Sequence, residues 1–372
     1  MKRLLLIGGG HAHVEVLRRF ALQPVPDTRI TVISPHRHTP YSGMLPGLIA
    51  GHYTFDDAHI DLLPLAARAG AELVLDRVVR LDAAARTGWA LERLNIGFEV
   101  CSIDIGSTPR ADVPGAREHA VGVKPVDRFL EQWSAEIEKA RTAARDDIAV
   151  VGGGAGGLEV LLAMQHAAGR AVTDDERRPR FHLITDTPVI LPSHSPSVRR
   201  QFERVLEARG VQVHLDARVT RVTPDQLEFA DGRMQRADFV VWATTAAAAP
   251  WIRASGLEVD ANGFMLVDCH LESVSHRHIF GSGDIAALQS GPIPKSGVFA
   301  VRKGPVLAHN LRCALAGGPM LPFISRPSAL GLISTGDRCA VMSWGSVALA
   351  GPWVWRWKDY IDRRFMAKYR LA

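Results

Sequence analysis

The chain has 372 residues, of which 47% are apolar and 22% are charged. This length and balance describe a globular protein of two or three domains and exclude disordered, collagen-like and coiled-coil classes. The formal net charge of +5 is small for the length, and residues 352–372 hold six Lys or Arg against Asp359 and Asp362, a balance of +4. A nucleic-acid-binding face is therefore not expected.

Hydropathy and cysteine spacing exclude further classes of protein. No run of about eighteen apolar residues occurs, so the sequence predicts neither a membrane-spanning helix nor a signal peptide. The cysteines form no C-x-x-C pair, which argues against a zinc site and a vicinal redox disulfide; they are Cys101, Cys269, Cys313 and Cys339. This sparse usage fits a cytoplasmic, thiol-reduced setting.

Two similar units follow one another along the chain. The first is predicted as a strand, a glycine turn, a helix and a second strand, over residues 2–7, 8–10, 13–22 and 29–34. The same order returns at residues 147–151, 152–157, 158–168 and 181–185. Each unit closes on a further strand, at 99–105 and 238–242. The order is typical of a βαβ nucleotide-binding unit.

The glycine turns carry the functional signal. Gly152, Gly154 and Gly157 satisfy G-x-G-x-x-G between a strand and a helix, where backbone N–H groups bind a pyrophosphate. Gly8 and Gly10 match in the first unit, but His13 replaces the third glycine, so we expect this helix to be pushed slightly outward. One match alone is equally compatible with a tight turn that binds nothing. Two matches, with Gly-Ser-Gly-Asp at 281–284, favour nucleotide binding.

The residue that would bind each ribose differs between the units. The second strand of the first unit ends at Ser34, so a hydroxyl replaces the usual carboxylate. The second unit has Asp186 just after its second strand. Asp186 favours NAD over NADP because no arginine lies beside it to take a 2′-phosphate.

Four segments, 8–18, 39–53, 123–127 and 295–305, resemble the FAD-dependent pyridine nucleotide-disulfide oxidoreductase superfamily. The resemblance is strongest to the flavoprotein branch associated with selenophosphate synthetase, and extends to type II NADH dehydrogenases and sulfide:quinone oxidoreductases. It implies an α/β fold with two Rossmann-like dinucleotide-binding domains of the glutathione-reductase type. The implied domains are 1–118 with 252–320 for FAD, 119–251 for NAD(P)H, and 321–372 for C-terminal strands and an amphipathic basic helix.

The resemblance also implies roles for single residues. FAD would meet Gly8, Gly10, Val78 and Gly106, and Asp284 would bond its ribityl chain. A helix from Ser296 would aim the N–H groups of Gly297 and Val298 at the flavin N1–C2=O edge, with Lys295 adding positive charge. Glu159 would face nicotinamide and flavin, and Lys124 is expected as its charge partner. Plainer roles stay open: a turn cap for Asp284, a solvated Lys295, and a helix-dipole acid for Glu159.

Histidines near the glycine turn offer a further candidate. His11 lies in the predicted phosphate turn and is a candidate for contact with flavin or substrate. His11 with His13, and His36 with His38, form two H-x-H pairs, but no third ligand accompanies them, so no metal site is expected.

Several departures from the relatives narrow the chemistry. Residues 36–51 lack the redox cysteine pair of disulfide reductases, and the cysteines that carry persulfide in sulfide:quinone oxidoreductases are not at their positions. Val298 and Arg302 occupy the glutamine positions of the type II NADH dehydrogenases. A quinone acceptor therefore loses its most specific support.

The C-terminal segment predicts an amphipathic helix. Trp353, Trp357, Ile361 and Phe365 recur at i+4 steps and are surrounded by Arg and Lys. Such a helix could lie on an anionic membrane surface. A helix docked on the FAD domain, or at a homodimer interface, is the alternative.

The sequence therefore predicts an FAD-dependent oxidoreductase that accepts hydride from NADH or NADPH and passes electrons to an unidentified small-molecule acceptor. Two alternatives stay open. One is a peripheral NADH:quinone oxidoreductase at the cytoplasmic face of the inner membrane. The other is a selenium-pathway flavoprotein partner with little NADH turnover.

Overall fold

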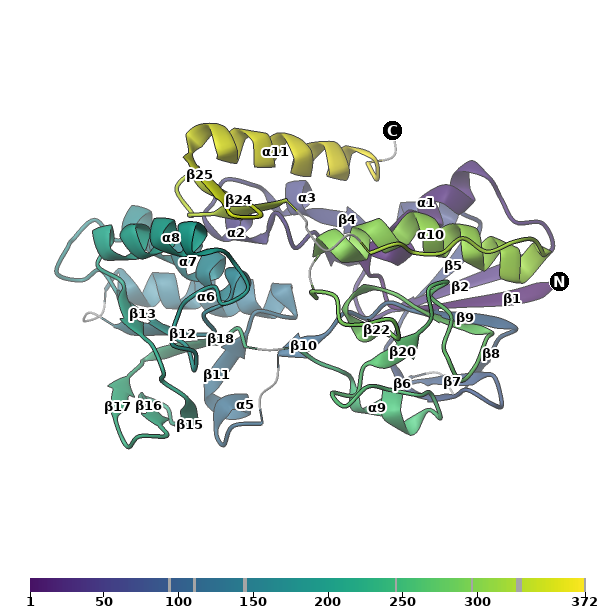
Figure 1. Ribbon diagram of the computed structural model, residues 1–372, viewed down its shortest axis with the longest axis horizontal. Helices are drawn as coiled ribbons and strands as arrows, with labels where there is room; N and C mark the ends of the chain where they lie inside the picture. Colours follow the sequence, from purple (N-terminus) through teal and green to yellow (C-terminus); the bar gives the residue numbers. More distant parts are fainter. Residues whose placement is uncertain are drawn as a thin grey trace.

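The computed structural model describes residues 1–92, 95–109, 112–142, 146–244, 246–295, 297–325 and 330–370. Two lobes lie side by side, each built on a five-stranded parallel sheet, and the C-terminal helix α11 (Pro352–Ala367) lies across the top (Figure 1). Parallel sheets flanked by helices confirm the predicted α/β class with two Rossmann-like units.

The first lobe contains the N-terminal unit. Its sheet has the order β5-β2-β1-β9-β21 and every neighbouring pair is parallel; the strands are β1 (Lys2–Ile7), β2 (Thr28–Ser34), β5 (Ala71–Leu75), β9 (Val100–Ile103) and β21 (Ile279–Gly281). Leu4 to Ile7 of the central strand are fully buried, as expected for a parallel strand covered on both faces. Helices α1 (His11–Leu22) and α10 (Gly297–Ala316) pack closely together. Gly304 allows this approach, because an added Cβ would lie 2.8 Å from the Cβ of Glu15.

Shorter elements complete the first lobe. They are β3 (His38–Pro40), α2 (Leu45–Ile49), α3 (Phe55–Ala58), β4 (His59–Asp61), α4 (Leu62–Arg68), β6 (Val78–Asp82), β7 (Thr87–Ala90), β8 (Ile96–Gly97), α9 (Pro250–Ala254), β20 (Met265–Val267), η1 (Gly283–Ile285) and β22 (Ala286–Leu288). Strands β6, β7 and β8 form a small antiparallel sheet beside the parallel one.

The second lobe repeats the arrangement. Its parallel sheet has the order β11-β18-β12-β13-β14, made of β11 (Ala120–Gly122), β12 (Asp147–Val151), β13 (Arg180–Ile184), β14 (Gln212–His214) and β18 (Phe239–Trp242). Around it lie α5 (Ala116–His119), α6 (Val126–Ala140), α7 (Ala155–Ala171), α8 (Pro196–Ala208) and an antiparallel sheet of β15 (Val219–Val222), β16 (Gln226–Phe229) and β17 (Met234–Arg236). The short strands β10 (Thr108–Pro109) and β19 (Ala246–Ala247) pair where the chain enters and leaves this lobe (Figure 1).

The C-terminal segment joins the two lobes. An antiparallel sheet of β23 (Gly331–Ser334), β24 (Ala340–Trp344) and β25 (Val347–Gly351) precedes α11. Ile333 and Val341 of this sheet belong to the core of the second lobe, whereas Phe365 and Met366 of α11 join the core of the first lobe. Burial of apolar surface therefore holds the C-terminal segment against both lobes.

The observed boundaries extend several predicted ones. Helix α7 begins at Ala155 and not at residue 158, because the glycine turn already contributes its first residues. Helix α10 runs from Gly297 to Ala316; the predicted start at Ser296 lies outside the described residues. The C-terminal helix is docked on protein, but its stripe divides: Trp353, Trp357 and Ile361 are exposed, while Phe365 is buried.

Close packing of α7 on the second sheet rests on Gly157. A Cβ added at Gly157 would lie 2.1 Å from the carbonyl oxygen of Gly152, whereas a Cβ at neighbouring Gly156 would meet nothing within 4 Å. Backbone cannot retreat as a flexible side chain can, so the first clash forces the helix away from the strand.

We expect Gly157→Ala to lower the free energy of unfolding by about 1–3 kcal/mol. Gly156→Ala is the matched control and should leave stability unchanged or slightly raised, since alanine favours a helix over glycine. Urea unfolding followed by circular dichroism measures both. Equal stability of the two variants would contradict the packing argument.

Candidate active site

The first glycine turn brings β1, β9 and α1 into close contact. Gly8 has φ +96°, and an added Cβ would lie 2.3 Å from the carbonyl oxygen of Asp104 at the end of β9. Only glycine fits both the left-handed conformation and this approach. The turn then starts α1, so the first-turn N–H groups of the helix lie at the carboxyl edge of the sheet.

His13 fills the place of a third glycine without leaving a polar atom unpaired. The imidazole is fully buried, Nδ1 donates to Gly8 O at 2.7 Å, and Nε2 lies 2.8 Å from Ser102 Oγ. Burial lowers the pKa of His13, which keeps the ring neutral. His13, the residue expected to push α1 outward, therefore links α1 to β1 and β9 through hydrogen bonds.

Asp104 is a site residue that the sequence reading missed. Its carboxylate is buried, and Oδ2 accepts hydrogen bonds from Ala12 N at 2.9 Å and His13 N at 3.2 Å. A carboxylate in this position is stabilised by the positive end of the helix dipole. The available signal was an acidic residue between Ile103 and Ile105, at the end of a strand that feeds a small-residue turn.

Asp284 lies where three segments meet. Its Oδ2 accepts from Ser107 Oγ at 3.2 Å and lies 3.6 Å from Lys124 Nζ, while Lys295 Nζ donates to its backbone oxygen. Gly106 adopts a left-handed φ of +68° beside this pairing, with its Cβ position 4.0 Å from Lys124 Nζ. The predicted pairing of Lys124 with Glu159 is therefore wrong: Lys124 reaches across to the Gly-Asp segment of the first lobe.

Lys303 is a second residue that sequence reasoning missed. It is fully buried within α10, and Nζ donates to Gly283 O at 3.2 Å. Burial, with repulsion from Lys295, lowers the pKa of Lys303 to about 8, against the attraction of Asp104 and Asp284. The lysine belongs to the 295–305 segment, but its register on the helix, and so its burial, follows only from the packing of α10.

The remaining predicted residues of the first lobe surround this turn at different depths. Ser34 is buried at the end of β2 and donates to His36 O at 2.8 Å, so its hydroxyl is already engaged. Val78 is buried at the start of β6, and Val298 is 42% exposed in the first turn of α10. A Cβ at Gly297 would lie 2.6 Å from Ser42 Oγ, which packs this helix end against the loop before α2.

The second glycine turn has an open helix end. Gly152 has φ +134°, and an added Cβ there would clash with Ala243 O at 2.3 Å. Gly154 caps α7 without a side-chain hydrogen bond, and a Cβ on it would meet nothing within 4 Å. Asp186 is exposed just beyond β13. These positions fit a dinucleotide whose pyrophosphate approaches α7 and whose ribose reaches Asp186.

Glu159 lies in the first turns of α7 and contacts the C-terminal sheet. Its Oε1 accepts from Ser334 N at 2.7 Å. Burial raises the pKa of Glu159 to about 7, opposed by the positive charge of Lys358 and by the Ser334 hydrogen bond. Lys358 itself donates to Gly43 O and forms an ion pair with Asp362 at 2.6 Å. The half-buried Glu159 therefore belongs, with the buried Lys358 and Asp362, to a polar cluster at the junction of the lobes and α11.

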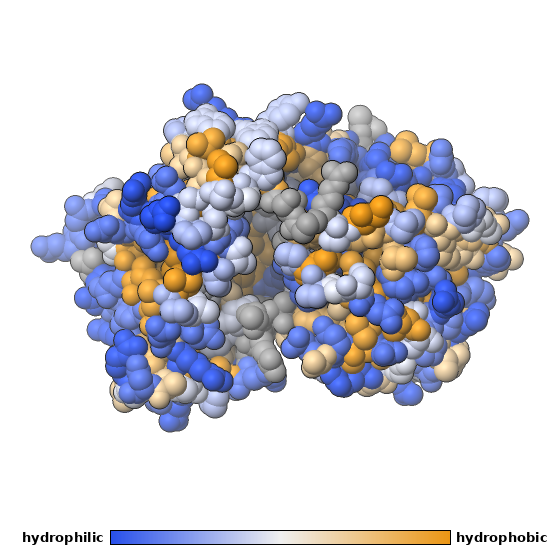
Figure 2. Space-filling view, viewed as in Figure 1, coloured by the Kyte–Doolittle hydropathy of each residue, from blue (hydrophilic) through white to orange (hydrophobic). Residues whose placement is uncertain are grey.

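The residues of the first turn fit the FAD that the resemblance implies. Among the described residues, His11 Nε2 and Ser282 Oγ are buried polar atoms without a hydrogen-bond partner. His11 follows the glycine turn, and Ser282 precedes Gly283 in the Gly-Asp segment. Burial lowers the pKa of His11, so its ring is neutral and offers a donor or an acceptor. Figure 2 shows the surface hollowed between the lobes, below the C-terminal sheet.

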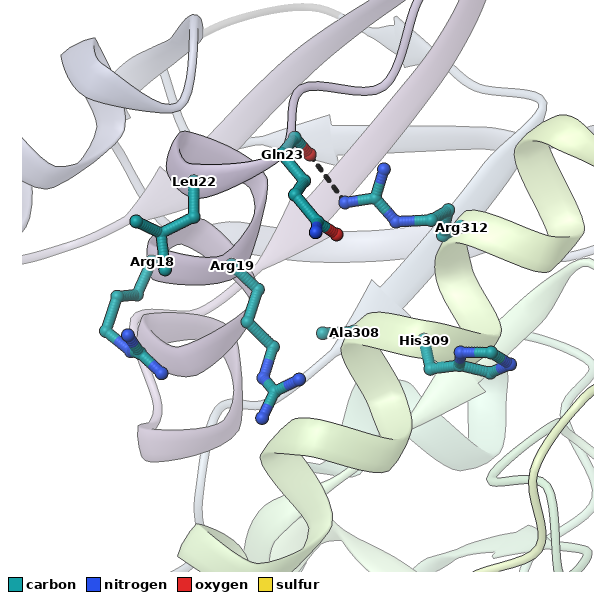
Figure 3. Close-up of a pocket in the computed structure, with 7 residues that line it drawn as sticks. All are labelled: Arg18, Arg19, Leu22, Gln23, Ala308, His309 and Arg312. Carbon is teal, nitrogen blue, oxygen red and sulfur yellow. Dashed lines mark hydrogen bonds between the residues drawn. The ribbon is translucent and has the colours of Figure 1, made fainter.

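Two other clusters have their polar groups engaged within the protein. A hollow of about 290 Å³ between α1 and α10 is lined by Arg18, Arg19 and Arg312 (Figure 3), but the first two pair with Glu15 and the third bonds Gln23 O. Asp268, His270 and Glu272 bring potential metal ligands within 4.8 Å. There Asp268 accepts from two backbone N–H groups of its own turn. The expectation of no metal site stays a prediction.

Comparison with known proteins agrees with this geometry. The sequence profile described as pyridine nucleotide-disulphide oxidoreductase matches residues 2–310. The chain is 27% identical over 275 residues to demethylphylloquinone reductase NdbB of Synechocystis, a match that covers 72% of this chain and 64% of the reductase. It is 24% identical over 294 residues to the NADH dehydrogenase-like protein YutJ of Bacillus subtilis, which covers 78% and 79% of the two chains.

A solved structure has the same fold. The sulfide:quinone oxidoreductase of Aquifex aeolicus superimposes with a TM-score of 0.82 at 19% identity, covering 100% of this chain and 92% of that chain. The profile match over most of the sequence, together with the two glycine turns, shows that the protein belongs to the pyridine nucleotide-disulphide oxidoreductase family, enzymes that bind FAD and use NAD(P)H.

Proposed function

We propose that the protein oxidises NADH, with FAD seated on the first lobe and NADH on the second, and delivers the electrons to a quinone. The observation that carries the proposal is the pair of glycine turns, each presenting a helix N-terminus at the carboxyl edge of its own parallel sheet. This is the edge at which dinucleotides bind in such folds. Bound FAD supplies the redox chemistry, taking a hydride and passing electrons on.

The chain's own residues supply orientation. In the proposed division, residues 1–118 and 252–320 seat FAD and residues 119–251 seat NADH. The ion pair between Lys124 and Asp284 spans this division and favours a fixed relation between the two sites. Holding two reactants in a fixed orientation lowers the free-energy barrier of a bimolecular transfer by several kcal/mol. Lys295 and the first turn of α10 place positive charge beside Asp284, where a reduced flavin would need it.

Glu159 is suited to hold a proton near neutral pH. Its pKa of about 7 matches the pH at which a general acid works best. From the first turns of α7, where its carboxylate accepts from Ser334 N of the C-terminal sheet, Glu159 would supply a proton to the acceptor. This role rests on the proposed placement of NADH and FAD.

A quinone acceptor at a membrane surface is favoured by the outer face of the C-terminal segment. Large apolar side chains are exposed there: Trp344, Val347, Leu349, Trp353, Trp357, Tyr360 and Ile361. Figure 2 shows apolar side chains gathered over the β24–β25 hairpin. Exposed aromatic side chains flanked by Arg356, Arg364 and Lys368 suit the interface of an anionic bilayer. The names of the Synechocystis and Aquifex proteins both refer to quinones.

In the part of the chain that the structure describes, no helix combines the length and the apolar character needed to cross a bilayer. The attachment that we propose is peripheral, through the exposed aromatic side chains of the C-terminal segment, at the cytoplasmic face of the inner membrane. Homodimer formation and the selenophosphate synthetase branch, with its alternative of a flavoprotein partner that turns over little NADH, stay predictions of the sequence.

Anaerobic mixing of the purified yellow protein with NADH should bleach the flavin absorption band, and NADPH should do so more slowly. The reason is the exposed carboxylate of Asp186, which repels a 2′-phosphate. Asp186→Ser should reduce the preference for NADH by about tenfold. Stopped-flow absorbance measures both cofactors. A wild-type flavin that NADH fails to reduce would overturn the proposed function.

The raised pKa of Glu159 predicts a pH-dependent stability. The folded state holds this proton more tightly than the unfolded state, so stability falls as pH rises from about 4.5 to about 7. Glu159→Gln keeps an acceptor for Ser334 N but cannot ionise, so its unfolding free energy should change less across this window. Urea unfolding at several pH values gives the comparison, and parallel curves for the two proteins would contradict it.

Replacing both Trp353 and Trp357 by Ser should weaken binding to phosphatidylglycerol vesicles by about tenfold, because two exposed aromatic side chains would no longer enter the interface. Leu22→Ser, at an exposed apolar position on α1, is the control and should bind as the wild type does. Vesicle flotation gives the bound fraction. Loss of NADH-dependent flavin reduction in the double variant would point to misfolding instead.

A further inference from the structure

The carboxylate of Asp104 lies between two glycine turns. A Cβ added at Gly10 would lie 2.3 Å from Asp104 Cγ, and a Cβ added at Gly283 would lie 2.2 Å from Asp104 Oδ1. The first turn belongs to the N-terminal strand–helix unit, and the second belongs to the Gly-Ser-Gly-Asp segment. The Asp104 carboxylate therefore lies in the narrow space between the two segments that are proposed to hold FAD.

Asp104 also uses the groups that a phosphate would use. Its Oδ2 accepts from the first-turn amides of Ala12 and His13, and its backbone oxygen accepts from Gly10 N at 3.1 Å. A helix N-terminus offers its free N–H groups and its dipole to one anion at a time. A side-chain anion at these amides is in direct competition with a ligand anion.

We propose that Asp104 is a built-in competitor for the pyrophosphate of FAD: the carboxylate and the cofactor bind the same amides of α1, so FAD must displace Asp104 to bind. The inference rests on the proposed placement of FAD on the first lobe. It makes Asp104 a determinant of how tightly FAD is retained.

Lysine side chains lie on both sides of the Gly-Asp segment that Asp104 contacts. Lys303 is buried behind Gly283, and Asp104 attracts its charge. Lys124 and Lys295 flank Asp284 on the other side of the same segment. Three lysines therefore surround two aspartates, and this positive excess offsets part of the charge that a pyrophosphate adds.

The second lobe provides an internal comparison. Helix α7 has the same glycine turn, but a Cβ added at Gly154 or Gly156 would meet nothing within 4 Å, whereas a Cβ added at Gly10 would clash with the Asp104 carboxylate. The competition is therefore specific to the first lobe. A change at Asp104 should alter the affinity for FAD and leave the affinity for NADH unchanged.

The test is the equilibrium fraction of FAD that leaves the purified holoprotein at each dilution, followed by the fluorescence of free flavin, which gives the dissociation constant. Asp104→Asn keeps the shape and an acceptor but removes the competing charge, so the dissociation constant of FAD should fall about tenfold. Asp104→Thr serves as the second variant if the first does not fold. An unchanged or higher dissociation constant would overturn the inference.

Two further variants separate this inference from the placement of FAD. Asp268→Asn is the matched control, because Asp268 also accepts from two backbone N–H groups, in the turn after β20, and its loss should not change the dissociation constant of FAD. Asp284→Asn should raise the dissociation constant of FAD if the cofactor binds at the Gly-Asp segment. A higher dissociation constant for this variant with an unaffected Asp104→Asn would refute the competition alone, whereas no effect in either would refute the placement itself.

Discussion

Close approach of a helix N-terminus to the carboxyl ends of parallel strands is the constraint on which the rest of the structure depends. The second lobe satisfies it with glycine: Gly157 leaves no room for even one carbon above Gly152 O. The first lobe satisfies it with hydrogen bonds, because His13 bridges Gly8 O and Ser102. Both arrangements bring first-turn N–H groups to the sheet edge, but the arrangement in the first lobe needs a neutral, buried imidazole to do so.

Charge differs between the two helix ends. The α7 end faces open space, whereas the α1 end faces the Asp104 carboxylate, with Asp284, Lys303 and the flanking lysines nearby. A carboxylate at a helix N-terminus stabilises the protein before a ligand arrives and must then be offset when a second anion binds. In the proposed placement of the two dinucleotides, the retention of FAD and the binding of NADH are therefore under separate electrostatic control.

The C-terminal sheet and α11 connect these sites to the rest of the molecule. Ser334 bonds Glu159 on the second lobe, and Lys358 bonds Gly43 on the first. The same segment buries Phe365 and Met366 while it exposes Trp353 and Trp357. One element thus packs against both lobes, sets the environment of the proposed acid and offers the proposed membrane surface, so a change in its docking would affect all three.

The sequence by itself determined the two strand–turn–helix units, the glycine turns and the α/β class, because hydrophobic periodicity and the left-handed turn are local properties. It could not place Asp104 or Lys303, whose importance depends on burial between segments that are distant in the chain. The sequence analysis predicted an ion pair between Lys124 and Glu159, but in the tertiary structure Lys124 forms an ion pair with Asp284. Packing across the two lobes decides which charged side chains form ion pairs and which face of α11 is buried. These contacts join residues that are distant in the chain, so no local sequence pattern predicts them.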